Sequence, residues 1–285
     1  MGGTPAGHRR LPERLDGPPC VSARAWAIAD GKTGKVLWEH DGSVRRQTAS
    51  LAKIMTGWIV AELAREDPGV LDEVATVSRP AQGIGGTTAQ LRAGDRGTVR
   101  SLLYGLMLPS GNDAAITLAE HFGARFARVR KETGSRRQVA MARFVAEMNR
   151  RARALALAKT RYINPHGLGL NLTSARDLAR LTFVALKNSL LREIVNVIRR
   201  RATYRRRDGS KRTVTLKNTN RLLAFRGYDG VKTGRTQGAK YCVVGSGRRG
   251  ADRLLVVVLG SSDIDARFVD ARNLFRWAWT QRRKQ

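Results

Sequence analysis

Short apolar runs lie near both ends of the chain and predict strands there. Residues 25–29 and 35–39 are separated by Asp30-Gly31-Lys32-Thr33-Gly34, whose glycines suit a tight reversal between two strands. Near the other end, Tyr241 to Gly245 and Leu254 to Leu259 are rich in valine and are separated by a turn of glycines and arginines. Each pair of segments predicts a β-hairpin.

The middle of the chain carries apolar residues at spacings of three and four, which is the pattern of one face of a helix. The first such segment runs from Ser50 to about Leu63, and Thr48 or Ser50 can cap its start. The same spacing predicts further helices at residues 98–108, 113–122, 137–157, 174–187 and, close to the end of the chain, 266–280.

Strands at both ends that enclose a helical middle predict an α+β fold. We expect an antiparallel sheet assembled from both ends of the chain and flanked by helices, with a helical lobe inserted at about residues 65–200. A cleft between the lobe and the sheet is the expected ligand site. Residues 1–21 are rich in Gly, Pro and Arg and predict a disordered leader, so a single domain is expected over residues 22–285.

The formal net charge of +30 suggests an anionic partner, but the charge is spread along the sequence. The clusters lie in apparent turns or at the chain end and lack the interleaved aromatic residues of a single-strand binding groove. They favour a solvated basic surface over a specific nucleic-acid site and are compatible with loose association with anionic envelope surfaces. These clusters are Arg199 to Arg201, Arg205 to Arg207, Arg248 with Arg249, and Arg282 to Lys284.

Cysteine and histidine give no sign of a metal site or of a disulfide framework. Cys20 and Cys242 are the only cysteines, and the four histidines show no ligand spacing. We therefore expect neither a metal ion nor an organic cofactor. The sequence also shows no apolar run of about 20 residues and no apolar export segment within residues 1–20.

Ser50-Leu51-Ala52-Lys53 is the first segment that can carry chemistry. A spacing of three on a helix brings the hydroxyl and the amine to one face. Serine needs a base to act as a nucleophile, and a lysine can supply it when burial or a nearby cation lowers its pKa. Because Ser-x-x-Lys often arises by chance and serine is a common helix cap, this segment alone is weak evidence.

Two further segments complete the pattern. Ser110-Gly111-Asn112 lies between two predicted helices, where Ser110 can relay a proton and Asn112 can donate to a carbonyl and orient Lys53, although either residue is also an ordinary cap. Lys232-Thr233-Gly234 opens a predicted strand: a cation and a hydroxyl together recognise a carboxylate, and the glycine lets a ligand approach. The N–H groups of Arg235 and Ser50 can then form an oxyanion hole.

The three segments occur in the order found in penicillin-binding proteins and class A β-lactamases. The chain resembles the D-alanyl-D-alanine carboxypeptidases, low-molecular-mass penicillin-binding proteins of a serine peptidase family, from about Ala23 to Trp279. The longer segments that carry this resemblance are Thr33 to Trp38, Thr48 to Thr56, Leu103 to Ala115, Asn164 to Leu168, and Asp229 to Gly234.

The resemblance implies a β-lactamase/transpeptidase-like fold and specific roles for these residues. Ser50 is the implied acyl-ester nucleophile and Lys53 its proton acceptor, Ser110 and Asn112 form the second element, and Lys232 with Thr233 binds the substrate carboxylate. Peptidoglycan pentapeptide stems are the implied substrates and β-lactams the implied inhibitors, without a metal or cofactor. Because that substrate lies outside the cytoplasm, a periplasmic or extracytoplasmic, envelope-associated location is expected.

Two alternatives stay open. A class A-like β-lactamase would share Ser-x-x-Lys, but no Glu-x-x-x-Asn element lies between Asn164 and Thr173, and the middle motif has Gly in place of Asp. Slow acylation by a chromogenic cephalosporin, rather than rapid turnover, would exclude it. A catalytically weak penicillin-binding wall sensor is disfavoured because every motif position is present, and a nucleic-acid binder would show a steep salt dependence of affinity.

Overall fold

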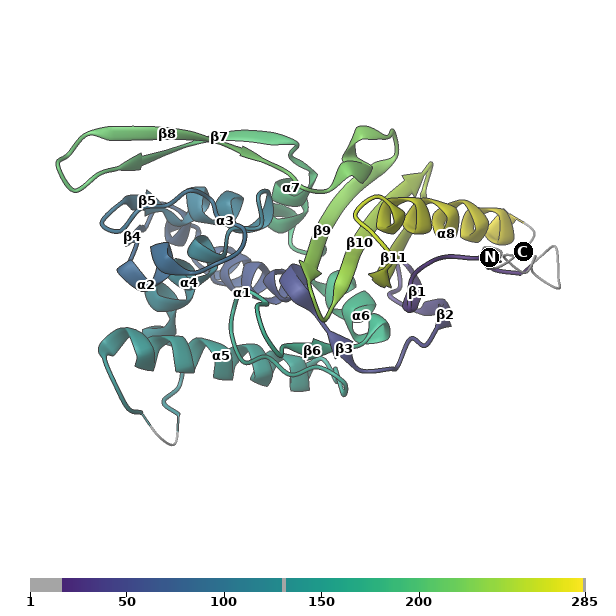
Figure 1. Ribbon diagram of the computed structural model, residues 1–285, viewed down its shortest axis with the longest axis horizontal. Helices are drawn as coiled ribbons and strands as arrows, with labels where there is room; N and C mark the ends of the chain where they lie inside the picture. The colour runs from purple at the N-terminus through teal and green to yellow at the C-terminus, as the bar shows by residue number, and fades with distance from the viewer. Residues whose placement is uncertain (1–16, 130–131, 284–285) are drawn as a thin grey trace, which may run out of the picture.

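A five-stranded antiparallel sheet joins the two ends of the chain (Figure 1). The computed structural model describes residues 17–129 and 132–283, so most of the predicted leader, residues 1–16, lies outside the described residues. The strand order is β2-β1-β11-β10-β9, which confirms the predicted assembly from both ends. These strands are β1 (Ala25–Asp30), β2 (Val36–His40), β9 (Tyr228–Thr236), β10 (Lys240–Arg249) and β11 (Asp252–Ser261).

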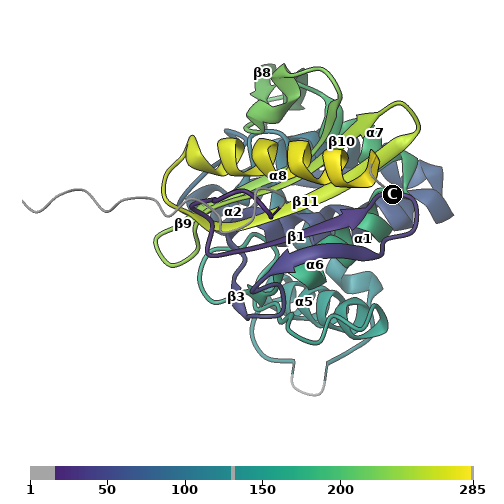
Figure 2. The same ribbon diagram turned by 90° about the vertical axis from the view of Figure 1, so that its right-hand side faces the viewer.

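The sheet is covered on both faces, which explains why its central strands are so apolar. All six residues of β1 are buried, and β1 pairs with β11 from Ala25 opposite Leu259 to Asp30 opposite Leu254. The terminal helix α8 (Ala266–Arg283) packs on one face, and α6 (Ala175–Ala185) lies on the other (Figure 2). Strands buried on both faces read as continuous apolar runs rather than as alternating ones.

The inserted lobe contains the predicted helices with small shifts at their ends. Its helices are α1 (Lys53–Glu66), α2 (Arg79–Gly83), α3 (Val99–Met107), α4 (Asn112–Phe122), α5 (Arg136–Ala154) and α7 (Ser189–Asn196). Short 3₁₀ turns are η1 (Ala49–Ala52), η2 (Pro68–Leu71), η3 (Gly123–Arg125) and η4 (Arg221–Ala224). Among the described residues, no helix is both long and apolar enough to cross a bilayer.

The start of the first helix differs from the prediction. Ser50 lies in the 3₁₀ turn η1, and α1 begins only at Lys53 without a side-chain cap. The hydroxyl of Thr48 instead donates to the carbonyl of Ala49 at 2.8 Å. The expected capping role of Thr48 or Ser50 was therefore wrong, and the Ser50 hydroxyl is left for other contacts.

The lobe also contains strands that the prediction missed. A second sheet has the order β4-β5-β7-β8, and a short pair joins β3 to β6. Arg199 to Arg201 open a strand, Arg205 ends it, and Arg248 and Arg249 are the last residues of β10, so placing these arginines in turns was wrong. The strands form because Ala202 and Tyr204 alternate with exposed residues, as a half-buried strand requires. The strands are β3 (Arg46–Gln47), β4 (Val74–Thr76), β5 (Arg96–Thr98), β6 (Leu172–Thr173), β7 (Arg199–Arg205) and β8 (Lys211–Lys217).

Candidate active site

The amine of Lys53 lies at the centre of a cluster of polar contacts. Its Nζ donates to Asn112 Oδ1 at 2.6 Å and to the His166 carbonyl at 2.7 Å, and it lies within hydrogen-bond distance of Ser50 Oγ, at 3.0 Å. The side chain is fully buried, whereas Ser50 is partly exposed. The amine thus joins the η1 turn, the start of α4 and the segment 164–168.

The loop before α4 presents the second motif without using it as a cap. Gly111 is the N-cap of α4 and makes no side-chain cap contact, so neither Ser110 nor Asn112 has the ordinary capping role. Asn112 Nδ2 donates to the Gly85 carbonyl at 2.7 Å, which aims the amide oxygen at Lys53. Ser110 has a positive φ of 69°, and its hydroxyl oxygen is buried without a hydrogen-bond partner in the structure. That hydroxyl is therefore available to a bound ligand.

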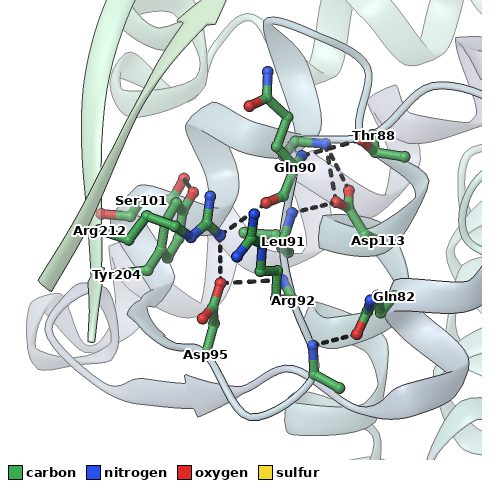
Figure 3. A network of polar contacts seen from close by, with 12 residues as sticks. Gln82, Thr88, Gln90, Leu91, Arg92, Asp95, Ser101, Asp113, Tyr204 and Arg212 are labelled. Atoms are coloured by element: carbon green, nitrogen blue, oxygen red, sulfur yellow. Dashed lines mark hydrogen bonds and ion pairs between the residues drawn. The ribbon is translucent and has the colours of Figure 1, made fainter. Parts of the chain in front are cut away.

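Asp113 fixes the loop that borders this motif (Figure 3). Its buried carboxylate accepts the backbone N–H of Ala89 at 2.8 Å and that of Leu91 at 3.0 Å. The backbone N–H of Asn112 donates to the Thr87 carbonyl at 2.8 Å. These bonds hold residues 87–91 against the start of α4 and keep Asn112 in place.

Strand β9 supplies the third motif from the edge of the main sheet. Lys232 and Thr233 are buried, and the Thr233 hydroxyl lies 2.6 Å from that of Thr219. A Cβ built on Gly234 would come within 3.2 Å of the Ser50 nitrogen, so β9 passes close to the η1 turn. An edge strand with a glycine at this point can accept an extended peptide as a further strand.

Burial and a nearby cation lower the pKa of each motif lysine. The pKa of Lys53 is well below its ordinary value, first because the amine is buried and then because Lys232 repels its charge. Burial also lowers the pKa of Lys232, to about 7, and Arg267 adds to the shift. A lysine with a lowered pKa loses its proton more readily than an ordinary lysine, and the uncharged amine can then accept a proton.

Comparison with known proteins decides the family. The family model described as D-alanyl-D-alanine carboxypeptidase matches residues 13–263. The chain belongs to this family of serine peptidases.

Relatives of the carboxypeptidase support the assignment along nearly the whole chain. A D-alanyl-D-alanine carboxypeptidase of Streptomyces sp. strain K15 is 35% identical over 98% of this chain and 92% of its own length. The carboxypeptidase DacC of Escherichia coli is 32% identical over 92% of this chain, which spans 62% of that relative's length. The crystal structure of the Streptomyces K15 DD-transpeptidase superposes with a TM-score of 0.84 at 36% identity, covering 93% of this chain and 99% of that one.

The structure also brings to β9 of the carboxypeptidase one buried cation that the sequence did not reveal. Arg267 of α8 is buried and donates to the Gly234 carbonyl at 3.2 Å, and burial lowers its pKa to about 10. Its Nε has no partner in the structure. The predicted site residue Arg235 is exposed, and its guanidinium lies over the Tyr241 ring, 5.3 Å from the centroid. No local motif surrounds Arg267, so only the packing of α8 on the sheet could have revealed it.

The carboxypeptidase offers no metal cluster within residues 17–129 and 132–283, where no group of three or more His, Cys, Asp or Glu side chains could hold an ion.

Gly167 lies against the backbone of Ala49 and Ser50, so an added side chain at this position has a clear expected effect. It has a φ of 96°, and an added Cβ would lie 2.0 Å from the Ala49 carbonyl oxygen. Gly167→Ala is expected to destabilise the carboxypeptidase by about 3 kcal/mol or more and to slow acylation, because η1 must shift. Chemical denaturation and the rate of penicillin labelling measure the two effects.

Gly169→Ala is the matched control. Gly169 has a similar φ of 82°, but the nearest atom to an added Cβ is 4.0 Å away, on Ile163. This variant carries only the cost of a positive φ, about 1–2 kcal/mol, and should be acylated at the wild-type rate. Equal loss in both variants would contradict a role for the close contact at Gly167.

The lowered pKa of Lys232 predicts a dependence of stability on pH. In the unfolded chain this amine keeps its proton up to about pH 10.4, whereas in the folded protein it loses the proton near pH 7. Between these values the unfolded chain binds more protons, so the free energy of unfolding rises with pH, by at most about 1.4 kcal/mol per pH unit. Unfolding in guanidinium at pH 7 and pH 9 should show a larger gain for wild type than for Lys232→Met; identical gains would exclude the shift.

Proposed function

We propose that the chain removes the terminal D-alanine from peptidoglycan stem peptides through an acyl-enzyme on Ser50. The observation that carries the proposal is the buried Lys53 amine, 3.0 Å from Ser50 Oγ, with a lowered pKa. Such an amine can take the hydroxyl proton as Ser50 attacks the penultimate D-alanine carbonyl. Asn112 Oδ1 and the His166 carbonyl orient the amine toward the serine.

The remaining steps use the other two motifs. Proton transfer to the departing D-alanine amine, from Lys53 directly or through the unpartnered Ser110 hydroxyl, breaks the peptide bond and leaves the acyl group on Ser50 Oγ. Backbone N–H groups of Ser50 and Arg235 stabilise the oxyanion. Water then attacks the ester, and Ser50 regains its proton.

Lys232, Thr233 and Arg267 are the proposed carboxylate binders. Two cations and a hydroxyl around Gly234 match a terminal carboxylate, and an arriving anion restores the proton to Lys232 by raising its pKa. In this proposal Lys53 acts as the uncharged base and Lys232 as the positively charged anion binder, so the two buried lysines have different roles. Asn112 is proposed to donate its amide to the substrate carbonyl.

Two related activities differ in which molecule accepts the acyl group from Ser50. The Streptomyces K15 relative is named both a carboxypeptidase and a DD-transpeptidase. Water as acceptor gives hydrolysis, and an amine gives transpeptidation. We propose hydrolysis as the main activity, together with acylation by β-lactams, and an extracytoplasmic, envelope-associated location where the substrate lies. No nucleic-acid substrate is needed for this activity.

A mapping experiment tests the proposal on the wild-type protein. The protein is incubated with labelled penicillin, digested and examined by mass spectrometry, and a parallel sample is given a stem pentapeptide with and without glycine as amine acceptor. We expect the adduct on the peptide containing Ser50 and one D-alanine released per tetrapeptide formed. A label on another residue, or rapid release of hydrolysed penicillin, would overturn the proposal, the latter in favour of a β-lactamase.

A further inference from the structure

The outer face of the β7–β8 hairpin places cations directly opposite cations. In the strand register Arg199 faces Lys217, and Arg205 faces both Lys211 on one side and Arg96 of β5 on the other. All five side chains are exposed. Like charges directly opposite one another destabilise a sheet, so packing alone gives no reason for this arrangement.

On the inner face of the same hairpin, the cations have partners within the protein (Figure 3). Arg212 forms an ion pair with Asp95 and donates to the Gln90 carbonyl at 2.8 Å. Arg200 lies over the Tyr104 ring, 5.0 Å from its centroid. On the outer face, none of the cations has a carboxylate partner within residues 17–129 and 132–283. These outer cations are Arg96, Arg199, Arg201, Arg205, Lys211 and Lys217.

The shape of the outer face and the uncharged residues on it limit the kind of anion that can bind there. Toward its far end the face forms a hollow of about 400 Å³ lined by Arg96, Arg205 and Lys211. Between the cations lie threonines, and the hydroxyls of Thr203 and Thr213 are 2.9 Å apart. The face therefore offers charge and hydroxyl groups in a row that is two strands wide along most of the hairpin and is joined by β5 at the hollow. The hairpin extends along one side of the lobe (Figure 1).

We propose that this face docks a linear phosphodiester polymer without bases, of the polyol-phosphate type. A ribbon that is two strands wide along most of the hairpin, and is widened by β5 only where Arg96 lies beside Arg205, holds one polymer chain lengthwise, with its phosphates beside the cations and its hydroxyls beside the threonines. Threonines in place of aromatic residues disfavour a single-stranded nucleic acid, whose bases need stacking partners. They also disfavour insertion into a membrane, which needs long apolar side chains.

Short segments of the chain connect the docking face to the active site. Two residues after Lys217, the hydroxyl of Thr219 lies 2.6 Å from that of Thr233. At the other side of the hairpin, the loop that binds Arg212 through Asp95 and Gln90 continues to Ala89, which Asp113 holds. A polymer on the hairpin is thus held next to the lobe that carries Lys53 and Asn112, where it keeps the enzyme close to envelope material.

A charge-removal variant of the full chain tests the proposal, with purified poly(glycerol phosphate) as the probe. The variant replaces five outer cations by glutamine, and the control replaces five exposed cations elsewhere, so both lose the same charge. The outer-face variant changes Arg199, Arg201, Arg205, Lys211 and Lys217. The control variant changes Arg136, Arg153, Lys159, Arg180 and Arg226.

We expect the outer-face variant to bind the polymer at least tenfold more weakly, with a shallower dependence of log affinity on log salt, and the control to bind nearly as wild type. The unfolding temperature of the outer-face variant should equal that of the wild type or exceed it, because cross-strand repulsion is removed. Its release of D-alanine from a short peptide should be unchanged. Equally weakened polymer binding in both variants would show that only the net charge of the protein matters, and it would overturn the proposal. Tighter binding of an oligothymidylate, or of vesicles with anionic lipid, would overturn the choice of polymer.

Discussion

Ser50→Ala is expected to form no covalent adduct with labelled penicillin and to release no D-alanine from a pentapeptide. Without the hydroxyl, Lys53 has no proton to accept and no acyl-enzyme can form. The rate should fall by a factor on the order of 10⁴ or more, because the catalytic residues act as a unit. Mass spectrometry of the intact protein and an assay of free D-alanine measure the two losses.

The folded state should tolerate this change. Ser50 is partly exposed, and its hydroxyl makes only the contact with Lys53 among the side-chain bonds of the described residues. The unfolding temperature of Ser50→Ala should therefore stay close to that of the wild type. Ser101→Ala is the matched control, since this serine lies on α3 and its hydroxyl contacts Thr98 instead. Equal labelling of wild type and Ser50→Ala would remove the assignment of the nucleophile.

Lys53→Met and Lys53→Arg are both expected to lose acylation by a factor of about 10²–10⁴. Met removes the amine, while Arg keeps a positive charge, because its guanidinium stays protonated and cannot accept a proton. The comparison separates a base from a cation that only attracts the substrate. Stopped-flow acylation by penicillin measures the rate for both variants and the wild type.

The stability of the two variants gives a second measurement. Met leaves the Asn112 amide oxygen and the His166 carbonyl without their donor, but it also removes a buried amine that Lys232 repels. We therefore expect a change in unfolding free energy of only about 1–2 kcal/mol for Lys53→Met. Acylation of Lys53→Arg within tenfold of wild type would contradict the role of Lys53 as base.

The sequence predicted the main sheet and the lobe helices because their signals are strong and local. Apolar segments near the two ends became β1 and β2 at one end and β10 and β11 at the other, and residues with helical spacing became α3 to α6. Three short motifs in a fixed order also predicted which distant residues meet. Lys53 contacts both Ser50 and Asn112, as the motif order implied.

The features that were missed depend on tertiary contacts. The β7–β8 hairpin has few apolar residues, and its run of arginines concealed the alternation of buried Ala202 and Tyr204 with exposed positions. Arg267 contacts Gly234 only because α8 packs on the sheet, 33 residues further along the chain. The 3₁₀ turn at Ser50 arises where Gly167 and Gly234 approach the backbone, and periodicity carries no information about that approach.

The pairing of β1 with β11 determines when this enzyme can work. A ribosome delivers residues 25–30 long before residues 252–261, so β1 can pair with β2 early, but its second partner, β11, is made more than 220 residues later. Lys232 likewise follows Ser50 by most of the chain length. A partly made or truncated polypeptide therefore has a serine and an amine but no carboxylate binder, which keeps it inert until synthesis of the fold is complete.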